Sequence, residues 1–146
     1  MVPPVDALFK VGINGIKARR SLGKTYVYFS TTARYSIYLV PVTQVVQAAD
    51  PVETLLTGTT VGDFLVARDG TTLGCTMISN TIFRVPAAGG EAVTVAGDEK
   101  SLTITSATAY MFNEDEIILN ASASGDHAMP VDGKTEPANV AEVKLR

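Results

Sequence analysis

The 146-residue chain contains few of the side chains on which enzymes and metal sites depend. It has one histidine, one cysteine and no tryptophan, and charged residues make up only 18% of it. Most active sites bring several reactive or ligating side chains together in one pocket. We therefore expect a protein that is not an enzyme, and we predict neither a cofactor nor a metal ion for it.

The single cysteine and the single histidine each lie where reactivity is not favoured. Cys75 lies in the apolar run Leu-Gly-Cys-Thr-Met-Ile, which predicts a buried, unreactive thiol. His127 follows Asp126, and an adjacent residue cannot orient a histidine as the acid of a catalytic triad does. We expect His127 to be a surface residue.

Long apolar runs and a signal peptide are also missing. No run approaches the ~20 residues of a membrane-spanning helix. The first residues, Met-Val-Pro-Pro-Val-Asp, provide neither the basic nor the apolar region of a signal peptide. These features predict a protein made in a cytoplasm, with no membrane partner and no secretion through a signal peptide.

Charge is unevenly distributed along the chain. The net charge of −3 argues against binding of nucleic acid over the whole surface. A basic N-terminal region followed by an acidic remainder predicts a contact with a neighbouring copy or another acidic surface. A solvated basic loop is the alternative. The basic residues of the first 34 positions are Lys10, Lys17, Arg19, Arg20, Lys24 and Arg34.

What the chain has instead is a series of short runs rich in Thr and Val, which favour β-strands. An Asp69-Gly70 pair between two such runs predicts a hairpin, because glycine adopts positive φ without penalty. Two more hairpins are predicted further along the chain. The predicted strands cover 24–30, 35–42, 61–67, 72–79, 81–85, 91–96 with 101–105, and 107–112 with 116–120.

One segment has the features of a helix. Asp50 is a good N-cap, Pro51 suits the first helical position, and Glu53 lies where a capping box places its acid. Gly58 would end the helix. The fold class expected for the chain is all-β: a sandwich or small barrel of about eight strands, with one short helix and extended N- and C-terminal arms.

Three parts are predicted: a basic N-terminal arm at 1–23, a β domain at 24–120 and an extended C-terminal tail at 121–146. The tail is rich in Ala, Ser, Gly, Asp and Pro, a composition that orders poorly alone. Val140, Val143 and Leu145 are candidates to add a strand to a partner's sheet. The alternative is that the tail packs back on its own domain.

Residues 18–25, Ala-Arg-Arg-Ser-Leu-Gly-Lys-Thr, match a relaxed phosphate-loop pattern with alanine in place of the first glycine. Phosphate binding of this kind requires a helix that begins at the lysine. The residues that follow Lys24 and Thr25 are β-branched or aromatic and favour a strand. We therefore do not expect nucleotide binding here.

Four of the five tyrosines fall within thirteen residues. Tyr26 and Tyr28 would share one face of a strand. Such rings line a domain's own core, form a protein interface, or stack on sugars; all three readings stay open. The candidate interface residues are Lys17, Arg19, Arg20, Tyr26, Tyr28, Tyr35, Tyr38, Val140, Val143 and Leu145.

A β-rich chain with few reactive residues, abundant Ala, Gly, Thr and Val, and extended ends resembles the accessory virion proteins of tailed bacteriophages, above all capsid decoration or cement proteins. The resemblance lies in the general character of the chain, and no motif carries it. It implies a virion protein whose partners are copies of itself, forming a homo-oligomer such as a trimer, and a major capsid protein. A carbohydrate- or receptor-binding β module, associated with a tail or neck, is the alternative.

Overall fold

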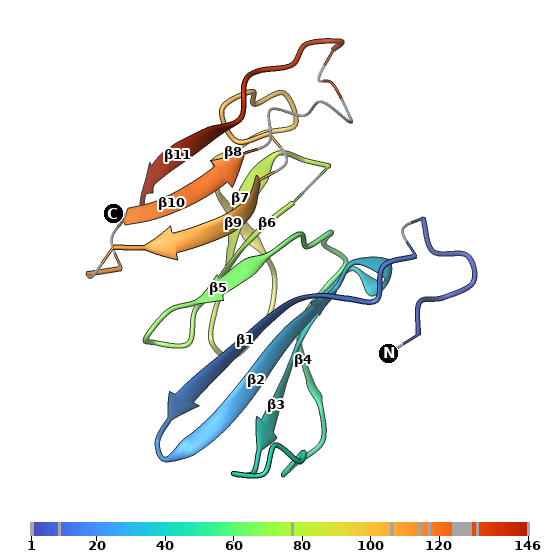
Figure 1. Ribbon diagram of the computed structural model, residues 1–146, viewed down its shortest axis with the longest axis vertical. Coiled ribbons are helices and arrows are strands. Elements are labelled where there is room, and N and C mark those ends of the chain that lie inside the picture. The colour runs from blue at the N-terminus through green and yellow to red at the C-terminus, as the bar shows by residue number, and fades with distance from the viewer. Residues whose placement is uncertain are drawn as a thin grey trace.

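The computed structural model describes residues 2–8, 10–76, 78–105, 107–113, 115–116, 118–123, 130 and 132–145, with the backbone alone for 108–112. The described residues contain eleven strands in three antiparallel sheets (Figure 1), which confirms the all-β prediction. The strands are β1 (Ile13–Ser21), β2 (Lys24–Thr31), β3 (Ser36–Val42), β4 (Glu53–Thr57), β5 (Phe64–Val66), β6 (Thr72–Cys75), β7 (Thr81–Val85), β8 (Val93–Gly97), β9 (Ala107–Phe112), β10 (Ile118–Ala123) and β11 (Asn139–Lys144).

Each sheet is built from strands that follow one another in the chain. The orders are β1-β2-β3-β4, β5-β6-β7-β8 and β11-β10-β9. The first strands of the three sheets lie together, with β5 in contact with both β1 and β9 (Figure 1). The described strands thus form three consecutive sheets about a shared centre, with no closed barrel among them.

Several hairpins follow the sequence signals. β5 and β6 pair across the turn that contains Gly70, whose φ is 92°. β9 and β10 also pair as predicted. The prediction of a hairpin between 91–96 and 101–105 is wrong, because β8, which includes most of the first segment, pairs with β7. Residues 98–101 form a turn in which Asp98 accepts hydrogen bonds from the backbone N–H groups of Lys100 and Ser101.

The predicted helix at 50–58 is wrong, because residues 53–57 form β4. Leu56 pairs with Ile37 of β3, and Leu55 and Leu56 are both buried in the core. Burial of the two leucines against other sheets outweighs weak capping signals. The described residues contain one 3-10 turn, Thr32–Arg34, and no helix in them is long and apolar enough to cross a membrane.

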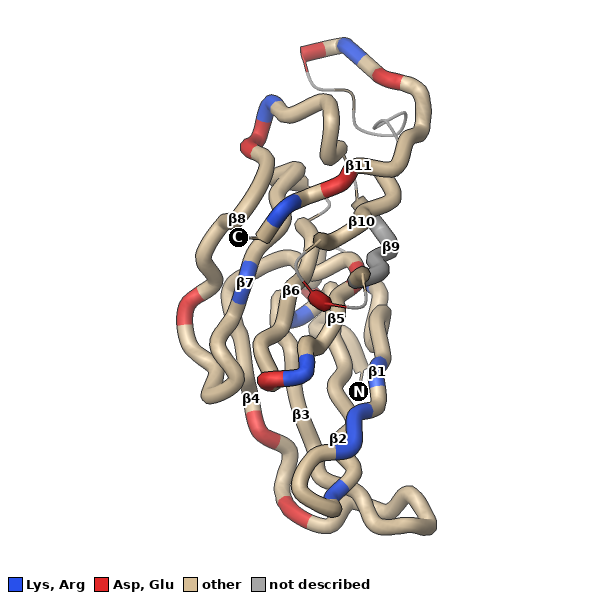
Figure 2. Tube along the Cα trace, turned by 90° about the vertical axis from the view of Figure 1, so that its left-hand side faces the viewer, with Lys and Arg blue, Asp and Glu red and all other residues tan. Residues whose placement is uncertain are grey.

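The two predicted arms each contribute a strand to the domain. Residues 13–21 pair along β2 as β1, so the basic side chains of this segment belong to the first sheet (Figure 2). Residues 139–144 pair with β10 as β11, which is the alternative in which the tail packs on its own domain. The predicted boundary at 120 therefore falls within β10. Both segments join a sheet because the alternating side chains of each line up with those of the neighbouring strand.

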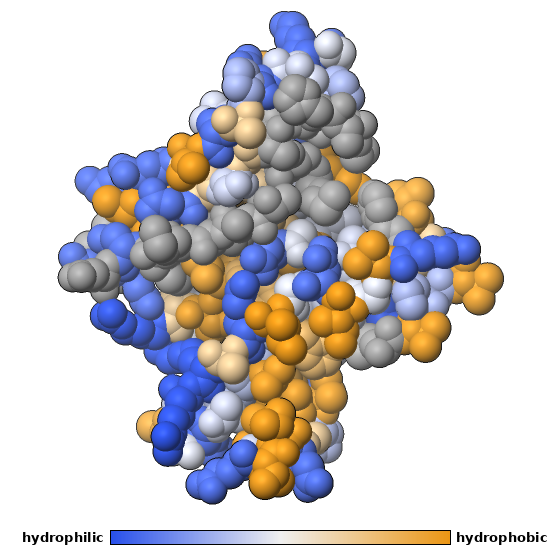
Figure 3. All heavy atoms as spheres, in the orientation of Figure 1, coloured by the Kyte–Doolittle hydropathy of each residue, from blue (hydrophilic) through white to orange (hydrophobic). Residues whose placement is uncertain are grey.

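Large hydrophobic side chains remain exposed on the first sheet and on the segment before it. Figure 3 shows them over the lower part of the molecule, where the first sheet lies, and on the right-hand lobe, where residues 2–8 and 10–11 lie. Contiguous apolar surface of this kind marks contact sites in soluble proteins. The exposed side chains include Val2, Val5, Leu8, Val11, Ile13, Ile16, Leu22, Val45 and Val46.

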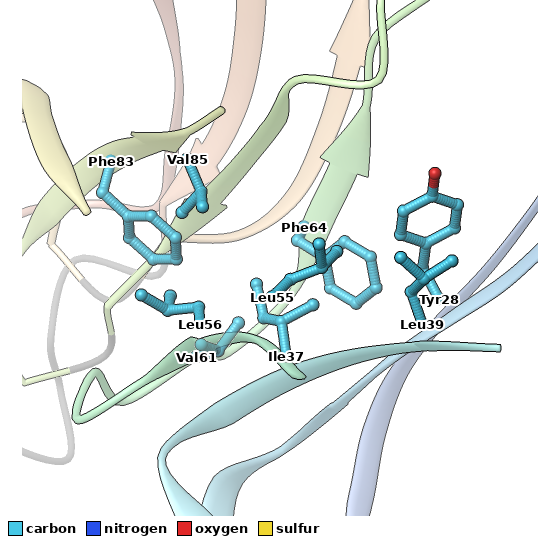
Figure 4. Packing of buried hydrophobic residues seen from close by; sticks show 9 residues of the cluster. All are labelled: Tyr28, Ile37, Leu39, Leu55, Leu56, Val61, Phe64, Phe83 and Val85. Carbon is cyan, nitrogen blue, oxygen red and sulfur yellow. The ribbon is translucent and has the colours of Figure 1, made fainter. Parts of the chain in front are cut away.

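Two buried clusters hold the three sheets together. The first cluster lies between the first and second sheets (Figure 4), and the second lies between the second and third sheets. Burial of apolar area is the main stabilising contribution in such a fold. The first cluster comprises Tyr28, Ile37, Leu39, Leu55, Leu56, Val61, Phe64, Phe83 and Val85, and the second comprises Leu73, Cys75, Ile82, Ile104, Ala107, Leu119, Ala121 and Ala141.

Candidate functional site

A charged cleft lies where β1, the β5–β6 turn and the loop after β9 meet. It consists of two adjoining hollows of about 350 and 340 Å³, both lined by Arg68 and Glu116. Lys17 and Arg19 reach it from β1, and Leu145 closes its other side from the C-terminal segment. All three sheets therefore contribute to this cleft.

Ion pairs and hydrogen bonds in the cleft join one sheet to the next. The Lys17 Nζ lies 3.1 Å from Oδ1 of Asp63, and Arg19 Nη2 donates a hydrogen bond to the Arg68 carbonyl oxygen. Glu116 Oε2 accepts a hydrogen bond of 2.8 Å from the Arg68 backbone N–H. Because these charges are partly exposed, each pair stabilises the fold only modestly. The pairs set the position of the sheets relative to one another.

Asp69 is the one described carboxyl group with a clear pKa shift. Its Oδ1 accepts a 2.8 Å hydrogen bond from the Thr71 backbone N–H, and this contact does most to hold the pKa below its ordinary value. Partial burial opposes the shift, while the Thr71 hydroxyl and, more weakly, Arg19 add to it. The carboxylate closes the β5–β6 turn and stays ionised at neutral pH.

Apart from the charged cleft, a separate hollow of about 730 Å³ lies beside Tyr35. Tyr35 has a left-handed backbone (φ 51°), which ends the short 3-10 turn and places the residue at the rim. The lining is mixed, with an aromatic ring, hydroxyl groups and two carboxylates. It includes Tyr35, Thr59, Thr76, Ser79, Asp98 and Glu99.

The four clustered tyrosines do not form one surface. Tyr28 is buried in the first cluster, and Tyr26 packs against it. Tyr38 lies on the opposite face of the sheet and stacks on Phe29, with ring centroids 5.2 Å apart. Tyr35 lines the hollow of about 730 Å³. The core reading therefore holds for Tyr28, with Tyr26 partly buried beside the same cluster, whereas Tyr35 and Tyr38 have separate surroundings.

The remaining candidate residues also separate. Lys17 and Arg19 lie in the charged cleft, whereas Arg20 is exposed. Val140 is 72% exposed, and Val143 and Leu145 pack against the second cluster.

The phosphate-loop match and the two single residues can also be placed. Residues 24–31 form β2 instead of a helix, so the phosphate-loop match has no helix at Lys24. Cys75 is fully buried, as predicted. His127 lies outside the described residues.

Sequence reasoning missed Arg68 and Glu116, which are 48 positions apart. Arg68 precedes the Asp69-Gly70 turn and Glu116 follows Asp115, and nothing local to either residue indicates the other. Among the described residues, no three His, Cys, Asp or Glu side chains lie close enough together to hold a metal ion.

No protein-family model and no curated protein matches the sequence. Solved structures do resemble the fold. A luciferin-regenerating enzyme matches 92% of this chain and 46% of its own, at 12% identity and a TM-score of 0.68. A virginiamycin B lyase from Staphylococcus aureus matches 92% of this chain and 42% of its own, at 13% identity and a TM-score of 0.53. The catalytically inactive H270A form of that lyase, with quinupristin, matches 99% of this chain and 44% of its own, at 11% identity and a TM-score of 0.51.

The likeness concerns the fold alone, because the identities are so low. Consecutive four-stranded antiparallel sheets about a common centre are the blades of a β-propeller. The chain is similar to part of a propeller-like structure and spans less than half the length of each of these neighbours.

Proposed function

We propose that this chain is a structural protein that binds the outer surface of a viral capsid shell and stabilises it. It acts through surface contacts repeated at many equivalent positions, and not as an enzyme. The observation that carries the proposal is the exposed apolar segment at residues 2–11. The choice of a viral shell as partner comes from the similarity of composition to phage decoration proteins.

The described residues of this segment, 2–8 and 10–11, present most of their side chains outward, while hydrogen bonds hold the backbone at both ends. The Ala33 backbone N–H donates to the Val11 carbonyl at 3.0 Å, and Arg34 Nη2 donates to the Val2 carbonyl at 3.3 Å. Val5 is nevertheless 94% exposed and Leu8 73% exposed. A contact segment held in place before binding loses less conformational entropy when it binds. This arrangement favours a role in contact.

Weak contacts of this kind gain strength by repetition. A single short apolar segment buries too little area for a stable complex by itself. On a shell with many equivalent positions, linked contacts raise the overall affinity without any new contact. A shell-binding protein therefore needs only modest surfaces, such as the one at residues 2–11.

Co-sedimentation with empty shells tests the proposal. The shells are assembled from the major capsid protein encoded in the same genome as this chain. The wild-type chain is expected to sediment with the shells to a fixed stoichiometry, and the Val5→Asp/Leu8→Asp variant to stay in solution. Leu22→Asp is the matched control, because Leu22 is fully exposed but lies at the far end of β1. Absence of wild-type binding, or equal binding by all three proteins, would refute the proposal.

A carbohydrate- or receptor-binding module, associated with a tail or neck, is the second candidate. The hollow beside Tyr35 favours it, because an aromatic ring next to hydroxyl and carboxylate groups suits the faces and hydroxyls of a sugar. On a glycan array, Tyr35→Ala would abolish binding and Tyr35→Phe would retain it. An array without binding above background by the wild-type chain would remove this candidate.

A further inference from the structure

Several charges of the cleft are engaged within the fold. Glu116 Oε2 accepts a hydrogen bond from the Arg68 backbone N–H, and Oε1 lies 3.8 Å from Nε of the same arginine. Asp69 accepts hydrogen bonds from the backbone and the hydroxyl of Thr71. Figure 2 shows charges of both signs gathered around β5 at the middle of the molecule. These groups hold the β5–β6 turn and the β9–β10 turn together.

Two further charges line the larger hollow of the cleft without such a partner. Arg84 of β7 and Asp115 of the β9–β10 turn both line the hollow of about 350 Å³. In the part of the chain that the structure describes, neither side chain makes a hydrogen bond or an ion pair within 4.0 Å. Opposite charges thus line one hollow without contacting each other.

These two charges come from opposite walls of the hollow. Arg84 lies directly opposite Leu73 in the register, and Leu73 packs in the cluster between the second and third sheets. Residues paired directly across antiparallel strands share a face, so Arg84 points from the second sheet toward the third. Asp115 lies in the turn that joins β9 and β10 of the third sheet. A molecule in the hollow would meet a cation on one side and an anion on the other.

The hollow also has an apolar lining. Leu73 is buried in the second cluster, and Val95 and Leu145 pack against that cluster. All three line the hollow, so its apolar part is the edge of the second cluster. Apolar walls with a few polar groups are typical of small-molecule sites, which have volumes of ~300–1,000 Å³. This hollow lies at the lower end of that range and therefore suits a small ligand.

The two charges and the apolar lining together select a ligand class. The guanidinium of Arg84 matches the planar geometry of a carboxylate, and the carboxylate of Asp115 suits an ammonium group. An ion of one sign would leave the other side chain unpaired. A free α-amino acid carries both charges on one carbon atom, whereas a dipeptide separates them by up to about 7 Å. Groups more than 4.0 Å apart suit the longer molecule.

We propose that this hollow binds an apolar dipeptide in its zwitterionic form. The peptide carboxylate binds Arg84, the peptide ammonium binds Asp115, and the aliphatic side chains lie against the apolar lining. The hollow is distinct from the segment at residues 2–11, so the proposal is independent of shell binding.

Isothermal titration calorimetry of the wild-type chain with leucyl-leucine tests the proposal. Saturable binding at one site per chain is expected. N-acetyl-leucyl-leucine has no ammonium group, and leucyl-leucine amide has no carboxylate. Each should bind at least about tenfold more weakly than leucyl-leucine, because one charged hydrogen-bonded contact is lost. Glycyl-glycine keeps both charges and should also bind more weakly, because it buries little apolar area.

Two variants assign each end of the peptide to its side chain. In Asp115→Asn, the preference for leucyl-leucine over its N-acetyl form should largely disappear, while the preference over the amide remains. Arg84→Gln should show the reverse pattern. Arg20→Gln and Asp50→Asn are the matched controls, because both residues are exposed and line neither hollow of the cleft. Both controls should bind leucyl-leucine as the wild-type chain does.

Other outcomes overturn the proposal. Absence of saturable leucyl-leucine binding by the wild-type chain would refute it, as would equal affinities for the free and the two blocked peptides. Equal losses in the cleft variants and the control variants would indicate non-specific attraction of charge. The peptide series on the wild-type chain alone decides the matter if a variant fails to fold, which circular dichroism melts reveal.

Discussion

At the scale of single residues, Gly74 leaves room for an aromatic ring in the core. It lies in β6 directly opposite Phe83 of β7, which is only 2% exposed. A Cβ at position 74 would overlap Cζ of that ring. We predict that Gly74→Ala lowers the free energy of unfolding by about 2 kcal/mol, as overpacking of a tight core does. Urea denaturation measures the change.

The double variant Gly74→Ala/Phe83→Leu separates the ring contact from other effects. A smaller side chain at position 83 removes the clash, so the second substitution should cost less in the Gly74→Ala background than in the wild-type chain. Additive losses from the two substitutions would show that the glycine matters for another reason.

Asp69 gives a prediction about pH. Its folded pKa lies below its unfolded value, so the ionised group stabilises the fold above the unfolded pKa, and this contribution is lost as pH falls through the folded pKa. Asp69→Asn should therefore lower the melting temperature at neutral pH and change it little at about pH 2. Thr71→Val keeps the backbone donor and should retain most of the pH dependence. An equal effect of Asp69→Asn at both pH values would contradict the explanation.

Residue roles could be predicted only where local context decides them. The apolar run around Cys75 indicated its burial correctly. The tyrosines could not be assigned in this way, because alternation shows which residues share a face but not which face is covered. Tyr28 lies in the core and Tyr38 on the opposite face of the sheet, although both lie in strands of similar character.

At the scale of elements, the β1–β2 hairpin has a strained turn. Leu22 and Gly23 both have positive φ, at 49° and 79°, as a two-residue hairpin turn of this type requires. Leucine adopts this conformation at a cost, and the Leu22 side chain is fully exposed, so it has no packing to compensate. We predict that Leu22→Asn raises the free energy of unfolding by about 1 kcal/mol. Chemical denaturation with Leu22→Val as the opposite control, expected to be destabilising, tests it.

The strand β11 is a second test at this scale. Ala141 is 7% exposed and packs in the second cluster, whereas its neighbour Glu142 is exposed. Ala141→Asp should lower the free energy of unfolding by more than about 2 kcal/mol, because it buries an unpaired carboxylate. Glu142→Asp should have almost no effect. If both variants melt like the wild-type chain, β11 does not belong to the domain in solution.

Strands and tight turns were readable from sequence, because alternation and turn residues act locally. The strand in the segment at 50–58 could not be read from the sequence. Its capping residues fit the start of a helix, whereas its two leucines are buried in the core as part of a strand. The N-terminal strand was misread for a related reason. Its basic residues suggested an arm that contacts a neighbouring copy or another acidic surface. The pairing of this segment with β2 is a contact between strands, which the distribution of charge does not reveal.

At the scale of the whole molecule, shell binding and folding make separate demands on the chain. Val5 and Leu8 are exposed and belong to neither buried cluster. The Val5→Asp/Leu8→Asp variant should therefore lose shell binding but keep the melting temperature of the wild-type chain. Circular dichroism melts beside the co-sedimentation assay distinguish loss of the contact from loss of the fold.

Each strand among the described residues pairs with its neighbours in the chain, and this has a consequence for how the protein folds. Its sheet pairings are formed between segments of small sequence separation, and such topologies fold faster than those built from distant pairings. The first sheet can be complete once residue 57 has left the ribosome, and each later sheet adds to a surface already formed. Folding would thus proceed from the N-terminus in steps of one sheet, as in repeat proteins. Until the second sheet arrives, both apolar faces of the first are open to solvent, which makes this early stage the one most exposed to aggregation.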